Sequence, residues 1–290
     1  MRVPREEVRQ RLCRLRRALR RDGLSAVLVA SDEDVHYLSG FTGSDSSLLI
    51  TGRRQWLITD SRYTEEAETT APGFAIEQWS GDPARFAGSL ARRARLKRMG
   101  FSAAALTVAA HRSLRSAARG VRLCRADRIV SDLRACKSPW EVRRIRRALA
   151  CAQQAFACVC GRIRTGMTEL DLRLDLEWEM RRRGADEAAF ETIVAARANA
   201  SQPHAHAGRR KLTRGSLVLI DFGACVDRYN CDLTRVLFLD SMPQFWKSRY
   251  ALVLEAQRAG LDAVGAGRPA AEADTAARAV FEEAGCAERF

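Results

Sequence analysis

Hydrophobic and polar residues alternate in a pattern of helices and short strands over the first third of the chain. Apolar positions recur at helical spacing in the charged N-terminal stretch, which predicts an amphipathic helix there (Val8, Leu12, Leu15 and Leu19). LSAVLVAS is a short apolar run of the buried-strand type, and SSLLITG and RQWLITD predict two strands joined by a turn at Gly52-Arg53. Residues 83–98 are expected to be helical, followed by a short strand around Phe101. This alternation predicts a three-layer α/β domain.

A domain boundary is predicted near Pro139. Ser138, Pro139 and Glu141 have the spacing of a helix start, with a capping serine, a proline at the first helical position and a capping-box glutamate. A long helix over 140–164 follows. We therefore expect one domain at 1–133 and a second, of α+β type, at 139–290.

The second domain is predicted to continue with helices and strands in mixed order. Thr168 caps a helix that ends at Gly184, with Asp171 at the third position beyond the cap. Strands are expected around FETIVAA, SLVLIDFGA and YNCDLTRVLFLD. Helices are expected over 243–264 and from Pro269 onward.

The chain is strongly basic, which raises the question of nucleic-acid binding. Its 49 Lys and Arg against 35 Asp and Glu give a net charge of +14. Only four of the basic residues are lysines, and the arginines are scattered along the whole chain rather than gathered in one stripe. This distribution indicates a compositional bias, so we expect no specific nucleic-acid partner and only weak polyanion binding at low salt.

Cysteine usage and hydropathy bear on the compartment. The nine cysteines are odd in number and irregular in spacing, which favours reduced, mostly buried thiols over a disulfide framework or a zinc site. No run reaches the roughly 18 apolar residues of a membrane helix. The charged N-terminus lacks the apolar core of a signal peptide. We therefore expect a cytoplasmic location and no membrane association.

Two aspartates in the segment 216–240 are the main candidates for chemistry. Asp221 ends an apolar strand, and Asp232 begins the next one. If the strands form a hairpin that turns near 226–227, the two carboxylates lie roughly opposite each other. Paired buried charges of like sign need neutralisation, which a divalent cation supplies. By spacing alone the alternative stays open that Asp221 caps a turn and Asp232 is solvated at an edge.

The histidines are few, and two of the four occur together in PHAH. His204 and His206 would point the same way in an extended segment. The sequence leaves open whether they bind a metal, move protons or lie in a solvated loop. His36 and His111, in the first domain, are interpreted as structural.

Five ordered motifs resemble one known family. FETIVA, PHAHAGRRKLTRGSLVLIDFGA and CDLTR match its strand, histidine and metal-ligand signatures, VHYLSGFTGSDSSLLITG with WLITDSRYTEEA matches its first domain, and LRACKSPWEVRRIRRA matches the helix that opens its catalytic half. The chain resembles the creatinase/aminopeptidase P/prolidase family of pita-bread metallopeptidases over essentially its whole length. The resemblance implies a creatinase-like α/β N-terminal domain, residues 1–133, and the first part of an α+β pita-bread metallopeptidase domain, residues 139–290.

The resemblance also implies roles for individual residues. Asp221 matches the family ligand of one metal ion, and Asp232 matches the ligand that bridges two. His204 matches the histidine that steadies the tetrahedral intermediate, whereas His206 falls at a variable position. Arg197 stands where many members have a glycine.

The implied activity is hydrolysis of the bond between an N-terminal residue and proline, as in an Xaa-Pro aminopeptidase or dipeptidase. Two divalent ions (Mn²⁺, Co²⁺ or Zn²⁺), a proline-containing peptide and a homodimer formed through the N-terminal domain are implied as cofactors, substrate and partner. The sequence ends at GCAERF, where family members continue into a segment with a further histidine ligand and two glutamates. We therefore expect an incomplete pita-bread domain, weak metal binding, negligible peptidase activity and an unpaired strand edge that promotes association.

Two other functions remain open on the same residues. A non-catalytic relative would use the fold as a binding or dimerisation scaffold. A different hydrolase such as a creatinase is a third possibility, and the two aspartates argue against it, because the creatinases do not use this ion pair.

Overall fold

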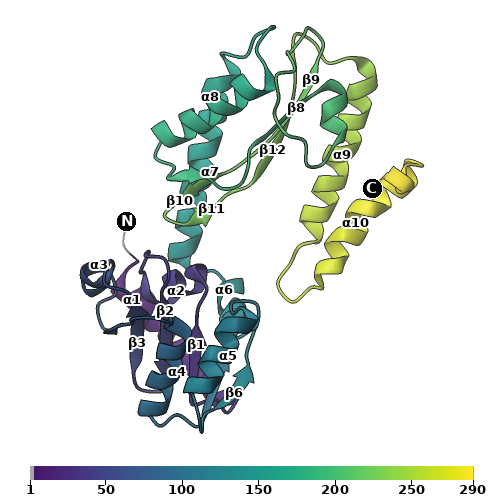
Figure 1. The fold of residues 1–290 in the computed structure, drawn as a ribbon. Helices are drawn as coiled ribbons and strands as arrows, with labels where there is room; N and C mark the ends of the chain where they lie inside the picture. Colours follow the sequence, from purple (N-terminus) through teal and green to yellow (C-terminus); the bar gives the residue numbers. More distant parts are fainter. Residues whose placement is uncertain (1–2, 290) are drawn as a thin grey trace. The chain divides into compact units, whose positions relative to one another are not determined.

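The computed structural model describes residues 3–289 (Figure 1). They divide into two compact units, with the boundary between Val142 and Arg143. Each unit has its own hydrophobic core.

The first unit alternates helices and strands, as the sequence predicts. Its helices are α1 (Arg5–Arg21), α2 (Asp32–Ser39), α3 (Thr64–Thr70), α4 (Pro83–Arg93), α5 (Val108–Ala117) and α6 (Ser131–Ala135). Its strands are β1 (Ala26–Val29), β2 (Ser47–Thr51), β3 (Gln55–Thr59), β4 (Ala75–Gln78), β5 (Arg98–Phe101) and β6 (Arg122–Arg125).

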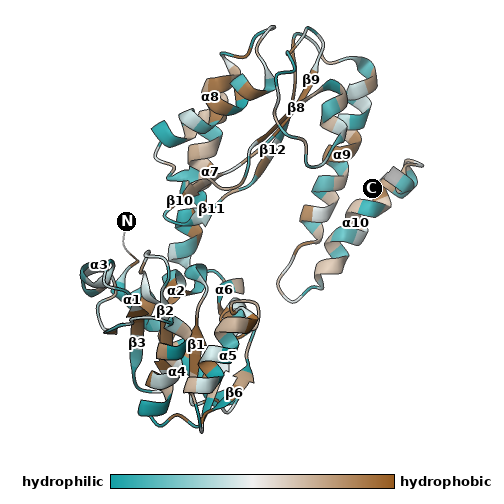
Figure 2. Ribbon diagram, viewed as in Figure 1, coloured by the Kyte–Doolittle hydropathy of each residue, from teal (hydrophilic) through white to brown (hydrophobic). Residues whose placement is uncertain are grey.

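One sheet in the order β4-β3-β2-β1-β5-β6 forms the middle layer of this unit. Its central strand β1 is buried along its whole length, and in Figure 2 it is mostly brown, the colour of hydrophobic residues. Val27 and Val29 belong to a core shared with helix α1, whereas Ala26 and Leu28 belong to the core shared with α4. Because successive side chains of a strand point to opposite faces, both faces are covered, and the predicted three-layer α/β domain is confirmed.

Helix α4 ends earlier than the pattern over 83–98 predicts. Its last residue is Arg93, and Arg95 adopts a left-handed conformation with φ of 52°. Strand β5 then begins at Arg98, where it pairs with β6 and β1. Alanine and arginine favour a helix at these positions, but the pairing of β5 inside the sheet overrides that local preference.

A buried arginine ties α1 to the start of helix α7 (Pro139–Cys160). Arg11 is 1% exposed, and its Nη1 donates a hydrogen bond of 2.7 Å to the Tyr37 carbonyl oxygen. Its Nη2 lies 3.5 Å from Glu141 Oε1, and its guanidinium lies over the Tyr37 ring. Glu141, eight residues beyond the expected domain end at 133, is therefore part of the first unit's packing.

The second unit contains α8 (Glu169–Arg182), the strands of two small sheets and a final helical hairpin. Its other elements are β7 (Glu187–Ala188), β8 (Ile193–Ala196), the 3₁₀ helix η1 (Arg197–Ser201), β9 (Leu217–Phe222), β10 (Ala224–Val226), β11 (Tyr229–Asn230), β12 (Leu233–Phe238), α9 (Gln244–Ala263), α10 (Ala270–Glu283) and η2 (Ala287–Arg289). Helices α9 and α10 pack against each other (Figure 1).

Both predicted capping boxes are present. The Ser138 N–H donates to Glu141 Oε2 at 2.9 Å, and the Glu141 N–H donates to Ser138 Oγ at 3.3 Å. At the start of α8, Thr168 and Asp171 exchange the same pair of hydrogen bonds. These local signals fix where the two helices begin because they satisfy N–H groups that have no partner inside the helix.

Helices α7 and α8 cover one face of the sheet β12-β9-β8. Val218, Ile220 and Phe222 of β9 point into this core and are at most 1% exposed. Strand β12 lies at the edge of the sheet, as expected for the strand that follows Asp232.

The cysteines are less buried than expected. All nine are free thiols, as predicted, but Cys151, Cys225 and Cys231 alone are buried, whereas Cys13 and Cys136 are exposed. Within residues 3–289, no helix combines the length and apolar character needed to span a membrane.

Candidate active site

Strand β9 presents Asp221 on the face opposite the α7–α8 core. Burial alternates residue by residue along the strand, and Asp221 is partly exposed between two buried neighbours. This alternation follows from the two-residue period of a strand. Asp221 therefore lies on the less buried face of β9, together with Leu217 and Leu219.

The hairpin that links Asp221 to Asp232 is shifted from the expected register. The chain turns at Asp227 and Arg228, whose φ values are 53° and 64°, one residue later than the expected turn centre. Asp221 therefore pairs with Thr234 instead of Asp232. A shift of the turn by one residue moves each partner by two positions, which keeps Asp232 on the same face but places it diagonally from Asp221.

Gly223 lies between β9 and β10, where the two sheets meet. A Cβ atom at this position would overlap the carbonyl oxygen of Cys231. The same region is tied across the hairpin by the Cys231 N–H, which donates to the Ala224 carbonyl at 3.0 Å. The glycine thus permits the close backbone approach that holds Asp232 beside β9.

Thr234 gives Asp221 a hydrogen-bond partner. Its hydroxyl donates to Asp221 Oδ1 at 2.9 Å. A donor on Oδ1 orients the carboxylate, and Oδ2 takes no part in this hydrogen bond. The sequence motif CDLTR includes this threonine, but its contact depends on the register and could not be inferred from spacing.

His204 lies in an exposed turn after η1 and β8, and His206 follows two residues later. His206 Nδ1 lies 3.3 Å from Glu191 Oε1, and this hydrogen bond, together with the charge of His206, lowers the pKa of Glu191 below its ordinary value. Among the residues that the structure describes, no three His, Cys, Asp or Glu side chains gather as a metal site. Asp221 lies on the open face of β9, and Asp232 is exposed in the short segment between β11 and β12.

A buried carboxylate that the sequence did not single out, Glu169, contacts the segment that carries these histidines. It accepts a hydrogen bond from the Ala196 N–H at 2.8 Å. From sequence it is an ordinary acidic residue in the first turn of a helix, and its burial is visible only in the folded chain.

Arg197 begins η1 with a φ of 55°, in the left-handed region. This conformation explains why glycine suits the position, since a side chain there is strained.

We expect Arg197→Gly to raise the free energy of unfolding by about 0.5–1 kcal/mol, because the relief of strain in the folded state exceeds the effect of the added chain entropy of the unfolded state. Urea denaturation measures the change, and Arg209→Gly, at an exposed residue outside the positive-φ positions, is the control that should not stabilise.

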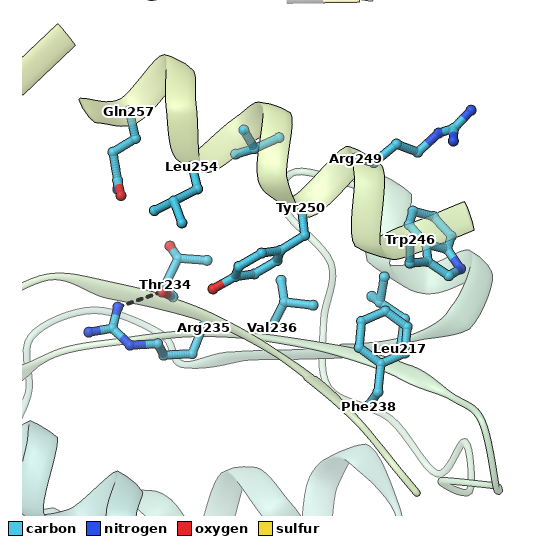
Figure 3. A pocket seen from close by; sticks show the side chains of 11 residues that line it. Leu217, Thr234, Arg235, Val236, Phe238, Trp246, Arg249, Tyr250, Leu254 and Gln257 are labelled. Atoms are coloured by element: carbon cyan, nitrogen blue, oxygen red, sulfur yellow. Dashed lines mark hydrogen bonds between the residues drawn. The ribbon is translucent and has the colours of Figure 1, made fainter. Parts of the chain in front are cut away.

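A groove of about 510 Å³ lies between β12 and α9 on the Asp221 face of the sheet. Figure 3 shows Tyr250 and Leu254 of α9 directed toward Thr234 and Val236 of β12. Thr234 lines the groove and also binds Asp221, so the groove adjoins the aspartate. Trp246 and Tyr250 of α9, which line the groove, are exposed, and β12 lies at the edge of its sheet.

Residues 143–290 match the sequence profile of metallopeptidase family M24, and residues 11–136 match that of the creatinase/prolidase N-terminal domain. An uncharacterized peptidase of Bacillus subtilis, YqhT, is 31% identical over 268 residues, which are 92% of this chain and 76% of that protein.

Solved structures of related enzymes share the fold. The Xaa-Pro dipeptidase from Bacillus anthracis superposes with a TM-score of 0.92 at 30% identity, over 97% of this chain and 79% of that one. The X-Pro aminopeptidase from Thermotoga maritima superposes with a TM-score of 0.87 at 32% identity, over 94% of this chain and 79% of that one. The chain belongs to the creatinase/prolidase family of pita-bread metallopeptidases, with a creatinase-type N-terminal domain followed by an M24 domain.

Proposed function

We propose that this chain carries part of the active site of a two-metal Xaa-Pro peptidase that cleaves the bond between an N-terminal residue and proline. The observation that carries the proposal is that Asp221 and Asp232 belong to one hairpin, within the stretch that matches family M24. The two-residue period of its strands supports a common face for the two side chains. Relatives named as an Xaa-Pro dipeptidase and an X-Pro aminopeptidase support the substrate class.

The donor set fits divalent cations that accept carboxylate oxygens, such as Mn²⁺, Co²⁺ or Zn²⁺. Asp221 and Asp232 would hold these ions. The ions, when bound, would supply a deprotonated water and polarise the scissile carbonyl.

The other residues of the site act on orientation and charge. Thr234 fixes the direction in which Asp221 presents its carboxylate, through the 2.9 Å hydrogen bond to Oδ1. His204, on its exposed turn, would donate a hydrogen bond to the carbonyl oxygen as negative charge develops there. The groove beside Thr234 is lined mainly by apolar residues, with Arg235 on the β12 wall and Arg249 and Gln257 on the α9 wall.

The experiment is peptide hydrolysis in the presence of Mn²⁺ or Co²⁺, with Ala-Pro and Ala-Pro-Ala as substrates and Ala-Ala as the control without proline. It is run on the 290-residue chain and on a chimera extended with the C-terminal part of the Bacillus anthracis relative. We expect turnover of the proline peptides by the chimera and negligible turnover by the chain alone. A chimera that cleaves Ala-Ala equally well would contradict the specificity. Preference for Ala-Pro over Ala-Pro-Ala would distinguish a dipeptidase from an aminopeptidase.

A second candidate is a non-catalytic scaffold that forms a homodimer through the N-terminal domain. It is favoured by the finding that the two aspartates have no third metal donor among the described residues. Analytical ultracentrifugation of the chain tests it. A dimer that forms without added metal, together with no turnover by the chimera, would favour the scaffold over the peptidase.

A further inference from the structure

Glu169 holds both ends of the loop 197–207, which carries His204. It is the first residue of α8, and its side chain is 1% exposed. Its Oε1 accepts from the Ala196 N–H at 2.8 Å, just before the loop, and its Oε2 accepts from the Gly208 N–H at 3.2 Å, just after it.

The same carboxylate also binds the interior of the loop. Asn199 Nδ2 lies 3.1 Å from Oε1 and 3.2 Å from Oε2, so one amide bridges both oxygens. Arg210, which follows the loop, places its Nε 3.7 Å from Oε1. Donors from before, within and after the loop therefore converge on one buried charge, and such charge-assisted hydrogen bonds are stronger than neutral ones.

Hydrogen bonds inside the loop are local by comparison. The Gln202 N–H donates to the Asn199 carbonyl, and the Ala205 N–H donates to the Gln202 carbonyl. Such bonds shape successive turns but do not fix the distance between the two ends of the loop. The backbone of α8 also holds the downstream end, since the Leu170 N–H donates to the Gly208 carbonyl and the Glu169 N–H to the Arg210 carbonyl. The Glu169 carboxylate connects this end to the upstream one, because its two oxygens bind backbone groups that are twelve positions apart in the chain.

We propose that Glu169 is a positioning residue that sets where the loop presents His204. The part of His204 in peptide hydrolysis rests on the proposed function above, whereas the dependence of the loop on Glu169 rests on the contacts alone. Glu169 is buried and acts through the loop, so it has no contact with substrate in this assignment.

Replacement of Glu169 by glutamine tests the assignment, because the amide side chain has nearly the same size and shape as the carboxylate. Both carboxylate oxygens accept from backbone N–H groups, and an amide has only one oxygen. In Glu169→Gln the –NH₂ group must face either the Ala196 N–H or the Gly208 N–H. Two hydrogen-bond donors then face each other, and that buried backbone N–H loses its acceptor. The charge that attracts Arg210 is lost as well.

The control is Glu179→Gln. Glu179 lies on the same helix, is equally a buried carboxylate, and pairs with Arg183 at 2.8 Å and Arg162 at 3.2 Å. Both substitutions remove a buried, ion-paired charge from α8, so both are expected to lower global stability. Only Glu169 contacts the loop.

Two measurements on the full chain read out the loop directly. Hydrogen exchange followed by mass spectrometry reports the peptide that spans 196–208. NMR spectra of histidine-labelled protein report the imidazoles, and the chain has four histidines, of which His36 and His111 in the first unit are internal references.

We expect exchange of the 196–208 peptide to accelerate about tenfold in Glu169→Gln, the effect of one lost buried hydrogen bond. The His204 and His206 signals should shift or broaden, while those of His36 and His111 stay in place. Asn199→Ala leaves the Glu169 carboxylate intact and should change the same signals to a smaller extent. It replaces Glu169→Gln as the test variant if that protein does not fold. Glu179→Gln should leave the loop unchanged.

Unchanged loop signals in both loop variants, or equal changes in Glu179→Gln, would overturn the inference. Because neither measurement needs turnover, the result is independent of the peptidase assay. Loop changes in a chain whose chimera cleaves no Xaa-Pro peptide would uphold the positioning role and reject the proposed function.

Discussion

In the chimera described above, replacing Asp221 by asparagine is expected to lower Mn²⁺ affinity more than about 100-fold, beyond the 10- to 100-fold loss that follows removal of an outer partner of a metal ligand. The neutral amide keeps the shape of the side chain but removes the negative charge that a divalent cation requires. In the chimera with the Bacillus anthracis C-terminal part, Xaa-Pro turnover should fall with the affinity. Isothermal titration with Mn²⁺ and the peptide assay measure the two effects.

The control is Asp240→Asn. Asp240 lies just beyond the far end of β12 and pairs with Arg214, away from the hairpin turn. It should leave Mn²⁺ affinity unchanged. Thr234→Val, which removes only the hydroxyl that binds Asp221 Oδ1, should lower affinity by about tenfold, the smaller effect of an outer partner. Equal effects of the Asp221 and Asp240 substitutions would show that Asp221 is not a ligand.

Gly223→Ala is expected to destabilise the chain by about 3 kcal/mol or more, at the upper end of the range for overpacked positions. The added methyl group would overlap the carbonyl oxygen of Cys231, which is backbone and cannot rotate away. Relief requires the two arms of the hairpin to separate where Gly223 faces Cys231, which moves Asp232 away from Asp221. Urea denaturation measures the loss of stability.

Gly161→Ala is the matched glycine control in the same unit. The nearest atom to its added Cβ would be the Cys158 carbonyl oxygen at 3.6 Å, an ordinary contact distance, and its φ lies outside the positive region. We expect a change within about 0.5 kcal/mol. A Gly223→Ala protein as stable as the Gly161→Ala protein would show that the hairpin accommodates the methyl group.

Local signals in the sequence predicted where α7 and α8 begin and which face of β9 is buried. The capping boxes at Ser138 and Thr168 depend on residues three positions apart, so the sequence contains the whole interaction. The alternation along β9 likewise determines which residues are buried. The position of Asp221 on the open face followed from that alternation alone.

Long-range features could not be predicted in the same way. The partner of Asp221 depends on where the hairpin turns, and an error of one residue in the turn exchanged Asp232 for Thr234. The Glu169 carboxylate binds the Ala196 and Gly208 N–H groups, which lie 27 and 39 positions further along the chain. No local sequence pattern encodes contacts of that separation. The early end of α4 reflects competition between helix propensity and a strand needed by the sheet.

The family resemblance supplied what spacing alone left open. Two aspartates eleven residues apart are compatible with a capped turn and a solvated edge, and the described residues add no third donor. The matches of both domains support the metallopeptidase assignment, while the roles of Asp221, Asp232 and His204 await the substitutions above.

The buried guanidinium of Arg11 bears on where this protein can be divided. Of its two carboxylate partners, Glu7 lies on α1 itself, whereas Glu141 lies in the first turn of the helix that leads into the second unit. A recombinant fragment or a gene fusion that ends at residue 133 would retain Arg11 in the core with Glu7 and discard Glu141. Removing one of the carboxylates that offset a buried charge is unfavourable. An engineered junction placed after Glu141 would therefore keep the whole environment of Arg11 when the N-terminal domain is transferred to another protein.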